Sequence, residues 1–577
     1  SEYDDYYYYP FIKNLSELNF NLSFDEEINN LRIIAIPFYT TIIHTLFFKL
    51  FGSWSILILQ ILFFSFVIYF FYYYLIQIGI NKNLAIILSF LLFLLPRFIE
   101  LQSLIDYIYL NNLSIYNLRF PNALVTKFFF YFYIYLIIQF NLKYKNLSEF
   151  KTKDIIILSI LFCFLLGSYY YFFMISALSF LIFLIYKNNF SFLFKFAELK
   201  KLTLLALTFI IFALPIFITN IYVEPDFLER LGVFQIDNEK KTKILLYIFT
   251  KFSKIEFILI LTLTFILTWI INIKKLEGYK IIIIFNIMLI ASLAAPIVFF
   301  LISPVTLHIS SFFAMIINLI FLNIFFQIIV FLKKFLNSIS LKFNSLKFLF
   351  LIFCAVFFNY IYLINFYQSK ITDEKYSIYR NELYLITESI NDYKRKNPDL
   401  KILTLDRNLQ VWSIMNNIKY IVPISGQVVS KTHDQIENDL IDTFNFFKLN
   451  EENFIKFLSV QKMNFRYTNA ELQNYFWGRY TANSLKTYND SNDFDQQVLK
   501  DIKNTPLIYH QNLAVPNFEI NRLREKFQNR SLNENFSPDL IIINNFFASM
   551  ITKPNGYCLK DKFQEFYYLV KTSDICK

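Results

Sequence analysis

The chain has 577 residues, of which 56% are hydrophobic and only 17% are charged, and its mean hydropathy is +0.43. These values exclude an ordinary soluble protein and indicate a polytopic membrane protein. The formal net charge is +11, but most of it follows from the loop lysines described below, so it does not predict a nucleic-acid partner.

The first 31 residues are polar and acidic. They include two adjacent carboxylates, Asp4 and Asp5, followed by Tyr8. Neighbouring carboxylates repel each other, and a nearby membrane adds to their desolvation cost, so the pair indicates a functional site. The other interpretation is that Asp4 and Asp5 only solvate a flexible chain end.

Apolar stretches dominate the next part of the chain. Residues 32–51 are apolar but interrupted by Pro37, His44 and Lys49, which favours a helix lying in the membrane interface. After residue 52 come apolar stretches that meet the requirement of roughly 20 residues for a bilayer crossing. They are residues 53–78, 83–99, 121–141, 154–186, 203–221, 255–273, 281–302, 309–332 and 348–366. The fourth stretch is long and has Gly167 and Ser168 at its middle, which predicts a tight hairpin of two spans.

The lysines test this order of spans, because loops on the cytoplasmic side carry an excess of Lys and Arg. If residues 1–31 lie outside, the alternate loops that fall inside are basic. Their lysines are Lys82, Lys143, Lys145, Lys151, Lys153, Lys187, Lys195, Lys200, Lys201, Lys274, Lys275, Lys280, Lys333, Lys334, Lys342 and Lys347. One outer loop departs from the pattern with five lysines between Lys240 and Lys254, and an amphipathic surface helix would explain it.

The same alternation places residues 367–577 on the outer side, after a membrane domain of residues 1–366. This part is mixed and charged. Apolar runs at 401–405, 420–423 and 540–543 alternate with helical patterns at 378–391, 432–447 and 494–502, which predicts a soluble α/β domain. No Gly-rich phosphate loop is found in it, so we expect this domain to bind or scaffold.

Cysteine and histidine positions add weaker predictions. Cys558 and Cys576 both fall in the outer domain, and a hairpin at 559–571 would bring them together as a disulfide; the alternative is two free thiols. His308 ends an outer turn after Pro304 and faces the same side as Asp4. Its alternative interpretation is an interfacial histidine without a role.

The acidic first loop with Asp4, Asp5 and Tyr8, the many following spans and the outer C-terminal domain together resemble the GT-C superfamily of integral-membrane glycosyltransferases. The resemblance covers residues 1–366, where residues 37–52 look like the return of the first outer loop to the membrane. Members have a helix before the acidic loop. That helix is missing here and the chain begins at Ser1, so we expect an N-terminally truncated fragment.

The resemblance implies an inverting transfer of a sugar from a polyprenyl-phosphate donor to a glycan, lipid or protein acceptor. Asp4 or Asp5 would take the acceptor proton as general base, or the pair would hold a divalent metal. Cations are expected near the leaving phosphate. Arg97 and Arg119, with Asp106 between them, are placed for substrate binding, as are Tyr8 and His308; the alternative for the arginines is snorkelling at helix ends.

These expectations place the chain in the bacterial inner membrane, with the C-terminal domain in the periplasm. A different class remains open, namely a non-catalytic, transport or polymerase component of surface-polysaccharide assembly. A transporter would carry polar or broken helices near the bilayer midplane. The predicted spans are almost free of ionisable groups, which favours chemistry at the outer interface.

Overall fold

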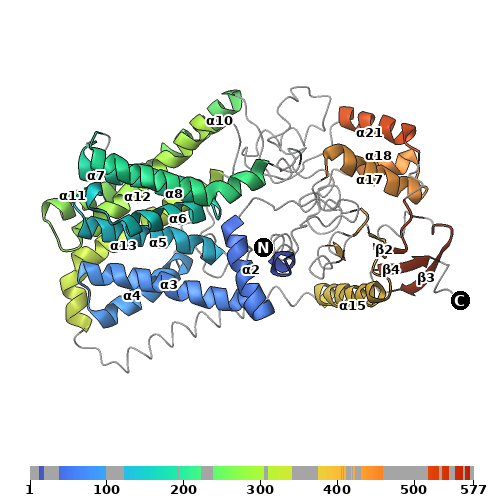
Figure 1. Cartoon of the computed structure of the whole chain (residues 1–577), viewed down its shortest axis with the longest axis horizontal. Helices are drawn as coiled ribbons and strands as arrows, with labels where there is room; N and C mark the ends of the chain where they lie inside the picture. Colours follow the sequence, from blue (N-terminus) through green and yellow to red (C-terminus); the bar gives the residue numbers. More distant parts are fainter. Residues whose placement is uncertain are drawn as a thin grey trace. The chain divides into compact units, whose positions relative to one another are not determined.

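The computed structural model divides the chain into two compact units, which are described separately (Figure 1). The membrane unit comprises Ser1–Asp5, Ala35–Ile221 and Gln235–Ile364, and the C-terminal unit comprises Tyr6–Ile34, Tyr222–Phe234 and Asn365–Lys577. The structure describes residues 12–18, 38–98, 123–190, 194–221, 226, 238–303, 309–340, 374–404, 406, 409–410, 418, 420–422, 431–458, 517–531, 536–544, 551, 553–562 and 566–571. The predicted domain boundary at 366 lies outside them.

The described part of the membrane unit consists of helices. They are α2 (Phe38–Phe51), η1 (Gly52–Trp54), α3 (Ser55–Ile78), α4 (Lys82–Phe98), α5 (Ala123–Lys143), η4 (Leu147–Glu149), α6 (Thr152–Leu166), α7 (Tyr170–Asn188), α8 (Phe196–Ile221), α10 (Asn238–Phe252), α11 (Ile255–Ile273), α12 (Tyr279–Ile302) and α13 (Ile309–Ser340). Within the described residues, six of them are long and apolar enough to cross a membrane. The predicted polytopic helical fold is confirmed, and the chain is a multi-pass membrane protein.

The predicted hairpin at Gly167 and Ser168 is present. Helix α6 ends at Leu166, α7 begins at Tyr170, and the two helices pack against each other. The expected interfacial helix is α2, which has 14 residues and is too short to cross a bilayer. The expected surface helix among the lysines is α10, which packs on α11 and α12. The predicted span at 348–366 lies outside the described residues.

The two ends of the helical bundle differ in charge. At one end, hydrogen bonds join loops that the sequence assigns to the inside. Asn337 donates to the Gly79 carbonyl (3.0 Å), Asn141 donates to the Lys280 carbonyl (2.9 Å), and Lys187 donates to the Asn141 carbonyl (3.1 Å). Because most described loop lysines predicted to face inside lie here, we call this the basic end. The opposite end carries the Gly167 turn and the starts of α2, α5 and α13.

The C-terminal unit is α/β, as predicted. Its described strands form a four-stranded sheet in the order β1-β2-β4-β3, in which β1 and β2 are parallel and the other neighbours are antiparallel. The strands are β1 (Ile402–Thr404), β2 (Leu540–Asn544), β3 (Tyr557–Lys562) and β4 (Phe566–Lys571), and the helices are α15 (Glu374–Lys396), α17 (His433–Phe446), α18 (Glu451–Leu458) and α21 (Asn517–Asn529). The predicted helix at 494–502 lies outside the described residues.

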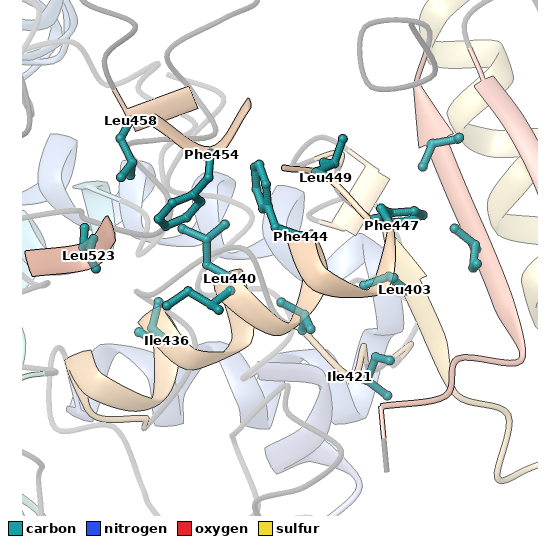
Figure 2. Close-up of a cluster of buried hydrophobic side chains, with 14 of the residues drawn as sticks. Leu403, Ile421, Ile436, Leu440, Phe444, Phe447, Leu449, Phe454, Leu458 and Leu523 are labelled. Carbon is teal, nitrogen blue, oxygen red and sulfur yellow. The ribbon is translucent and has the colours of Figure 1, made fainter. Parts of the chain in front are cut away.

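Helix α17 is the centre of the larger core in this unit. It presents Ile436, Leu440 and Phe444 at helical spacing toward Phe454 of α18 and Leu523 of α21 (Figure 2). Thr432 caps its start, because the Thr432 hydroxyl accepts from the Gln435 backbone and the Gln435 side chain accepts in return. The apolar side of α17 is thus buried by packing, which leaves its acidic side for α21.

Ion pairs join α17 to α21. Glu437 is 2% exposed and binds both guanidinium nitrogens of Arg522 (2.6 and 3.0 Å) and the Lys526 ammonium (3.0 Å). Five residues further along α17, buried Asp442 binds Arg530 through two bonds of 2.7 and 2.6 Å. The hydrogen bond to Glu437 raises the pKa of Arg522 above its usual value, and Asp442 does the same for Arg530.

One residue from between α8 and α10 belongs to this unit. The Asp226 carboxylate accepts from the His433 backbone N–H (2.6 Å) at the start of α17, where a negative charge is favourable. The side of the membrane on which residue 226 and the C-terminal domain lie stays a prediction.

Candidate functional site at the opposite end of the bundle

Most of the site residues predicted from the sequence lie outside the described residues. These are Asp4, Asp5, Tyr8, Asp106, Arg119, His308 and Cys576. Arg97 lies in the last turn of α4, but its side chain is not among those described. Cys558 is disulfide-bonded, and its pairing with Cys576 stays a prediction. The site can therefore be built only from the described side chains at the end of the bundle where these residues were expected.

Aromatic rings from several helices pack together at this end. The Phe130 ring of α5 stacks on Phe172 of α7, with centroids 5.0 Å apart. Tyr171 packs edge-on against Phe312 near the start of α13, at 4.7 Å, and Tyr170 packs against Phe299 near the end of α12, at 5.3 Å. Such contacts add to the burial of large rings, so they fix α5, α7, α12 and α13 relative to one another.

Lys127 stands one turn before these rings, in the second turn of α5. It is half-buried, and it lies at helical spacing from Phe130, Tyr131 and Ile134, which are all buried. The side of α5 that carries Lys127 therefore faces the interior of the bundle and not the lipid. An ionisable group on the inward side of an apolar helix in a membrane protein is costly to bury, and this cost makes it a functional-site candidate. The sequence contained this signal, because Lys127 interrupts the apolar stretch 121–141, but the charges of the loops do not reveal it.

The start of α2 closes the same end of the bundle. The Tyr39 backbone N–H donates to the Gly167 carbonyl (2.9 Å), and the Tyr39 ring stacks on Phe164 (4.6 Å). Phe164 in turn packs on Phe129 of α5 (4.8 Å). A Cβ atom on Gly167 would lie 2.5 Å from Tyr39 Cδ2 and 2.8 Å from Ile216 Cδ1. Only glycine allows this close approach.

Two buried hydroxyls lie next to this contact without a hydrogen-bond partner in the described structure. They are Thr40 Oγ1, in the first turn of α2, and Ser168 Oγ, in the turn before α7. A buried polar group that lacks a partner costs about 1–3 kcal/mol, so these hydroxyls are available to a polar ligand. Lys127 belongs to α5 at the same end of the bundle, and an ammonium group and hydroxyls are the kinds of group that bind an anion such as a phosphate.

Among the described residues no group of three or more His, Cys, Asp or Glu side chains could hold a metal ion. The suggested divalent metal at Asp4 and Asp5 lies outside them and stays a prediction.

Comparison with solved structures gives a likeness in fold. The fold is similar to that of ArnT from Cupriavidus metallidurans, solved bound to undecaprenyl phosphate. The match covers 99% of this chain and 94% of ArnT, with 11% sequence identity and a TM-score of 0.38. No family model and no curated protein matches the chain.

Proposed function

We propose that the chain is a GT-C-type membrane glycosyltransferase that transfers a sugar from a polyprenyl-phosphate donor to an acceptor. The transfer would take place at the end of the bundle opposite the basic end. This end would face the periplasm across the bacterial inner membrane. The observation that carries the proposal is the placement of Lys127 on the inward side of α5, beside a wall of aromatic rings. The isoprenoid tail of such a donor is apolar and would pack against the apolar bundle. Its phosphate is an anion and would be attracted to a cation at the edge of the bundle.

The proposed transfer has a balanced course. The acceptor oxygen attacks the anomeric carbon, so a carbon–oxygen bond forms on one side of the sugar while its bond to the donor phosphate breaks on the other. The polyprenyl phosphate leaves with the electron pair, and Lys127 stabilises the charge that develops on it. The acceptor proton goes to Asp4 or Asp5 as general base. Arg97 and Arg119 would bind the same phosphate as Lys127. Arg97 belongs to the end of α4, Lys127 to the start of α5, and Arg119 to the segment that joins these two helices.

A second candidate is a transport or assembly component for a lipid-linked glycan. A cluster of buried polar side chains on α11, α12 and α13 favours it, because polar groups within spanning helices are more frequent along a transport path. The two candidates predict different products. Transfer forms a new glycosidic bond and releases polyprenyl phosphate, whereas transport moves the intact lipid-linked sugar between the leaflets.

The test is a transfer assay on the full chain in nanodiscs, with a panel of polyprenyl-phosphate sugars and detection of released polyprenyl phosphate. Lys127→Met should lower turnover about 100-fold, as the loss of one charge-stabilising donor does, whereas Lys127→Arg should retain most of it. Lys334→Met removes an exposed lysine at the basic end and should have no effect. Asp4→Asn or Asp5→Asn should lower turnover about 10²- to 10⁴-fold. Full turnover in Lys127→Met would remove this residue from the site, and glycan flipping without release would favour the second candidate.

A further inference from the structure

Three buried amides of the membrane unit, Asn286, Asn323 and Gln327, belong to one hydrogen-bonded cluster across three helices. The Thr268 hydroxyl of α11 accepts from Asn286 of α12 (2.7 Å) and from Gln327 of α13 (2.7 Å). Gln327 also donates to the Thr264 carbonyl of α11 (2.9 Å) and to Asn323 Oδ1 one turn away on α13 (3.1 Å). Asn323 and Gln327 are fully buried, and Asn286 is 6% exposed.

Backbone carbonyls decide which end of each amide is the nitrogen, because a carbonyl can only accept. Gln327 must present Nε2 to the Thr264 carbonyl, and Asn286 must present Nδ2 to the Ile282 carbonyl (2.8 Å). Since Gln327 Nε2 is a donor, the atom of Asn323 that faces it must be the oxygen. The orientations of all three amides therefore follow from the bonding pattern and are not interchangeable.

This pattern leaves three buried atoms without a partner: the acceptors Gln327 Oε1 and Asn286 Oδ1 and the donor Asn323 Nδ2. Lipid offers no hydrogen bond to satisfy them. A metal cation would suit the two oxygens but would be repelled by the amide hydrogens of Asn323. A water molecule donates twice and accepts, and buried waters typically make about three hydrogen bonds to groups of this kind.

We propose that this cluster is a binding site for a buried water molecule, which bridges Gln327 Oε1, Asn286 Oδ1 and Asn323 Nδ2. The site lies in the half of the bundle nearer the basic end, because Asn286 is roughly 10 Å along α12 from its start at Tyr279. It ties α11 to the bundle. Helix α11 buries Phe257, Thr264 and Ile271 at seven-residue spacing, and Thr264 at the middle of this narrow seam joins the cluster.

The first test is a high-resolution structure of the wild-type chain in nanodiscs. Solvent density within about 2.7–3.2 Å of at least two of the three atoms is expected. An empty cluster would overturn the proposal. So would density that contacts only the two oxygens and is replaced by Rb⁺ or Tl⁺, because that result identifies a cation site.

The second test is a double-mutant cycle between Asn286→Ala and Asn323→Ala in a Thr268→Val background. This background removes the hydroxyl that links Asn286 to Gln327, so that the bridging water is the connection left between the two amides. The unfolding equilibrium constant of the double variant should differ about threefold to tenfold from the product of the single effects. Gln139 contacts Tyr73 elsewhere in the bundle, so the cycle between Asn286→Ala and Gln139→Leu should be additive. Additivity in both cycles would contradict the bridge.

Discussion

Two contacts between helices in this chain differ in their chemistry. One joins α17 to α21 in the C-terminal unit, and the other joins α11, α12 and α13 in the membrane unit. The first pair uses full charges, with Glu437 and Asp442 bound by three cations. The second set uses only neutral amides and hydroxyls around Gln327. Water can reach the outer part of the first contact, since Arg522 is 43% exposed and Arg530 is 30% exposed. Neither water nor counterions reach the second contact from lipid, so that charges there would carry their full desolvation cost.

The largest effect expected from this contrast is at Asp442. Arg530→Met should lower the free energy of unfolding of the C-terminal unit by about 3–5 kcal/mol, because it leaves a carboxylate that is 4% exposed without its cation. Asp442→Leu should cost less, since the remaining Arg530 can turn to water. Unfolding followed by pulse proteolysis of the full chain measures both variants. Equal losses would show that the two partners are equally desolvated.

The next effect is at the hairpin turn of the membrane unit, where stability depends on close packing and not on charge. Gly167→Ala places a methyl group 2.5 Å from the Tyr39 ring, so the start of α2 must shift. Overpacking of this kind costs about 1–3 kcal/mol. Thermal unfolding in nanodiscs should show the loss, and Tyr39→Ala in the same chain should restore part of it. Wild-type stability in Gly167→Ala would mean that α2 moves without cost.

A pH scan probes the C-terminal unit at Tyr557, whereas the amide cluster of the membrane unit does not titrate. Burial, with a smaller contribution from Asp539, raises the pKa of Tyr557 from 10.0 to about 12, and its hydroxyl donates to the Pro538 carbonyl. Between pH 10 and 12 the unfolded chain has lost this proton and the folded chain keeps it. The unfolded state then binds fewer protons, so the unfolding free energy falls as the pH rises, by about 1–2 kcal/mol in total.

Tyr557→Phe is the matched control for this pH dependence. It keeps the ring against Phe446 and removes the titrating hydroxyl. The difference between wild type and Tyr557→Phe isolates this group from the other tyrosines of the chain. It should be constant below pH 10 and should shrink above it. A difference independent of pH up to 12 would contradict the raised pKa.

Local patterns in the sequence predicted the elements whose cause is local. Gly167 and Ser168 indicated the turn between α6 and α7, and alternating loop lysines indicated which helix ends lie together. The contacts between helices were not predictable in this way. Glu437 and Arg522 are 85 residues apart in the sequence, and Thr268 and Gln327 are 59 apart, so that only the tertiary packing brings them together.

The candidate site shows the same division. The acidic pair and the arginines were proposed from a resemblance and from loop positions, and they stay predictions. Lys127 was detectable, because a charge within an apolar span is costly wherever the helix lies. Its direction was not, since inward and lipid-facing positions on α5 look alike in a sequence where both sides are rich in Phe, Tyr and Ile. Only the packing of Phe130 on Phe172 shows which side is inward.

The smallest effect is expected for the amide cluster itself. Gln327→Leu keeps the approximate size of the side chain and removes its hydrogen bonds to Thr264, Thr268 and Asn323. Polar contacts between spanning helices contribute only about 0.6 kcal/mol on average and about 1.7 at most, because the alternative states in the membrane also find partners. We expect a loss in this range by steric-trap or SDS unfolding, well below that of Arg530→Met. Gln139→Leu is the matched control, since this glutamine donates to the single hydroxyl of Tyr73 between α5 and α3, and it should cost less than Gln327→Leu. A cost of 3 kcal/mol or more at Gln327, roughly that of breaking a buried ion pair, would contradict the contrast between the two units, because the neutral cluster would then contribute as much as the charged one.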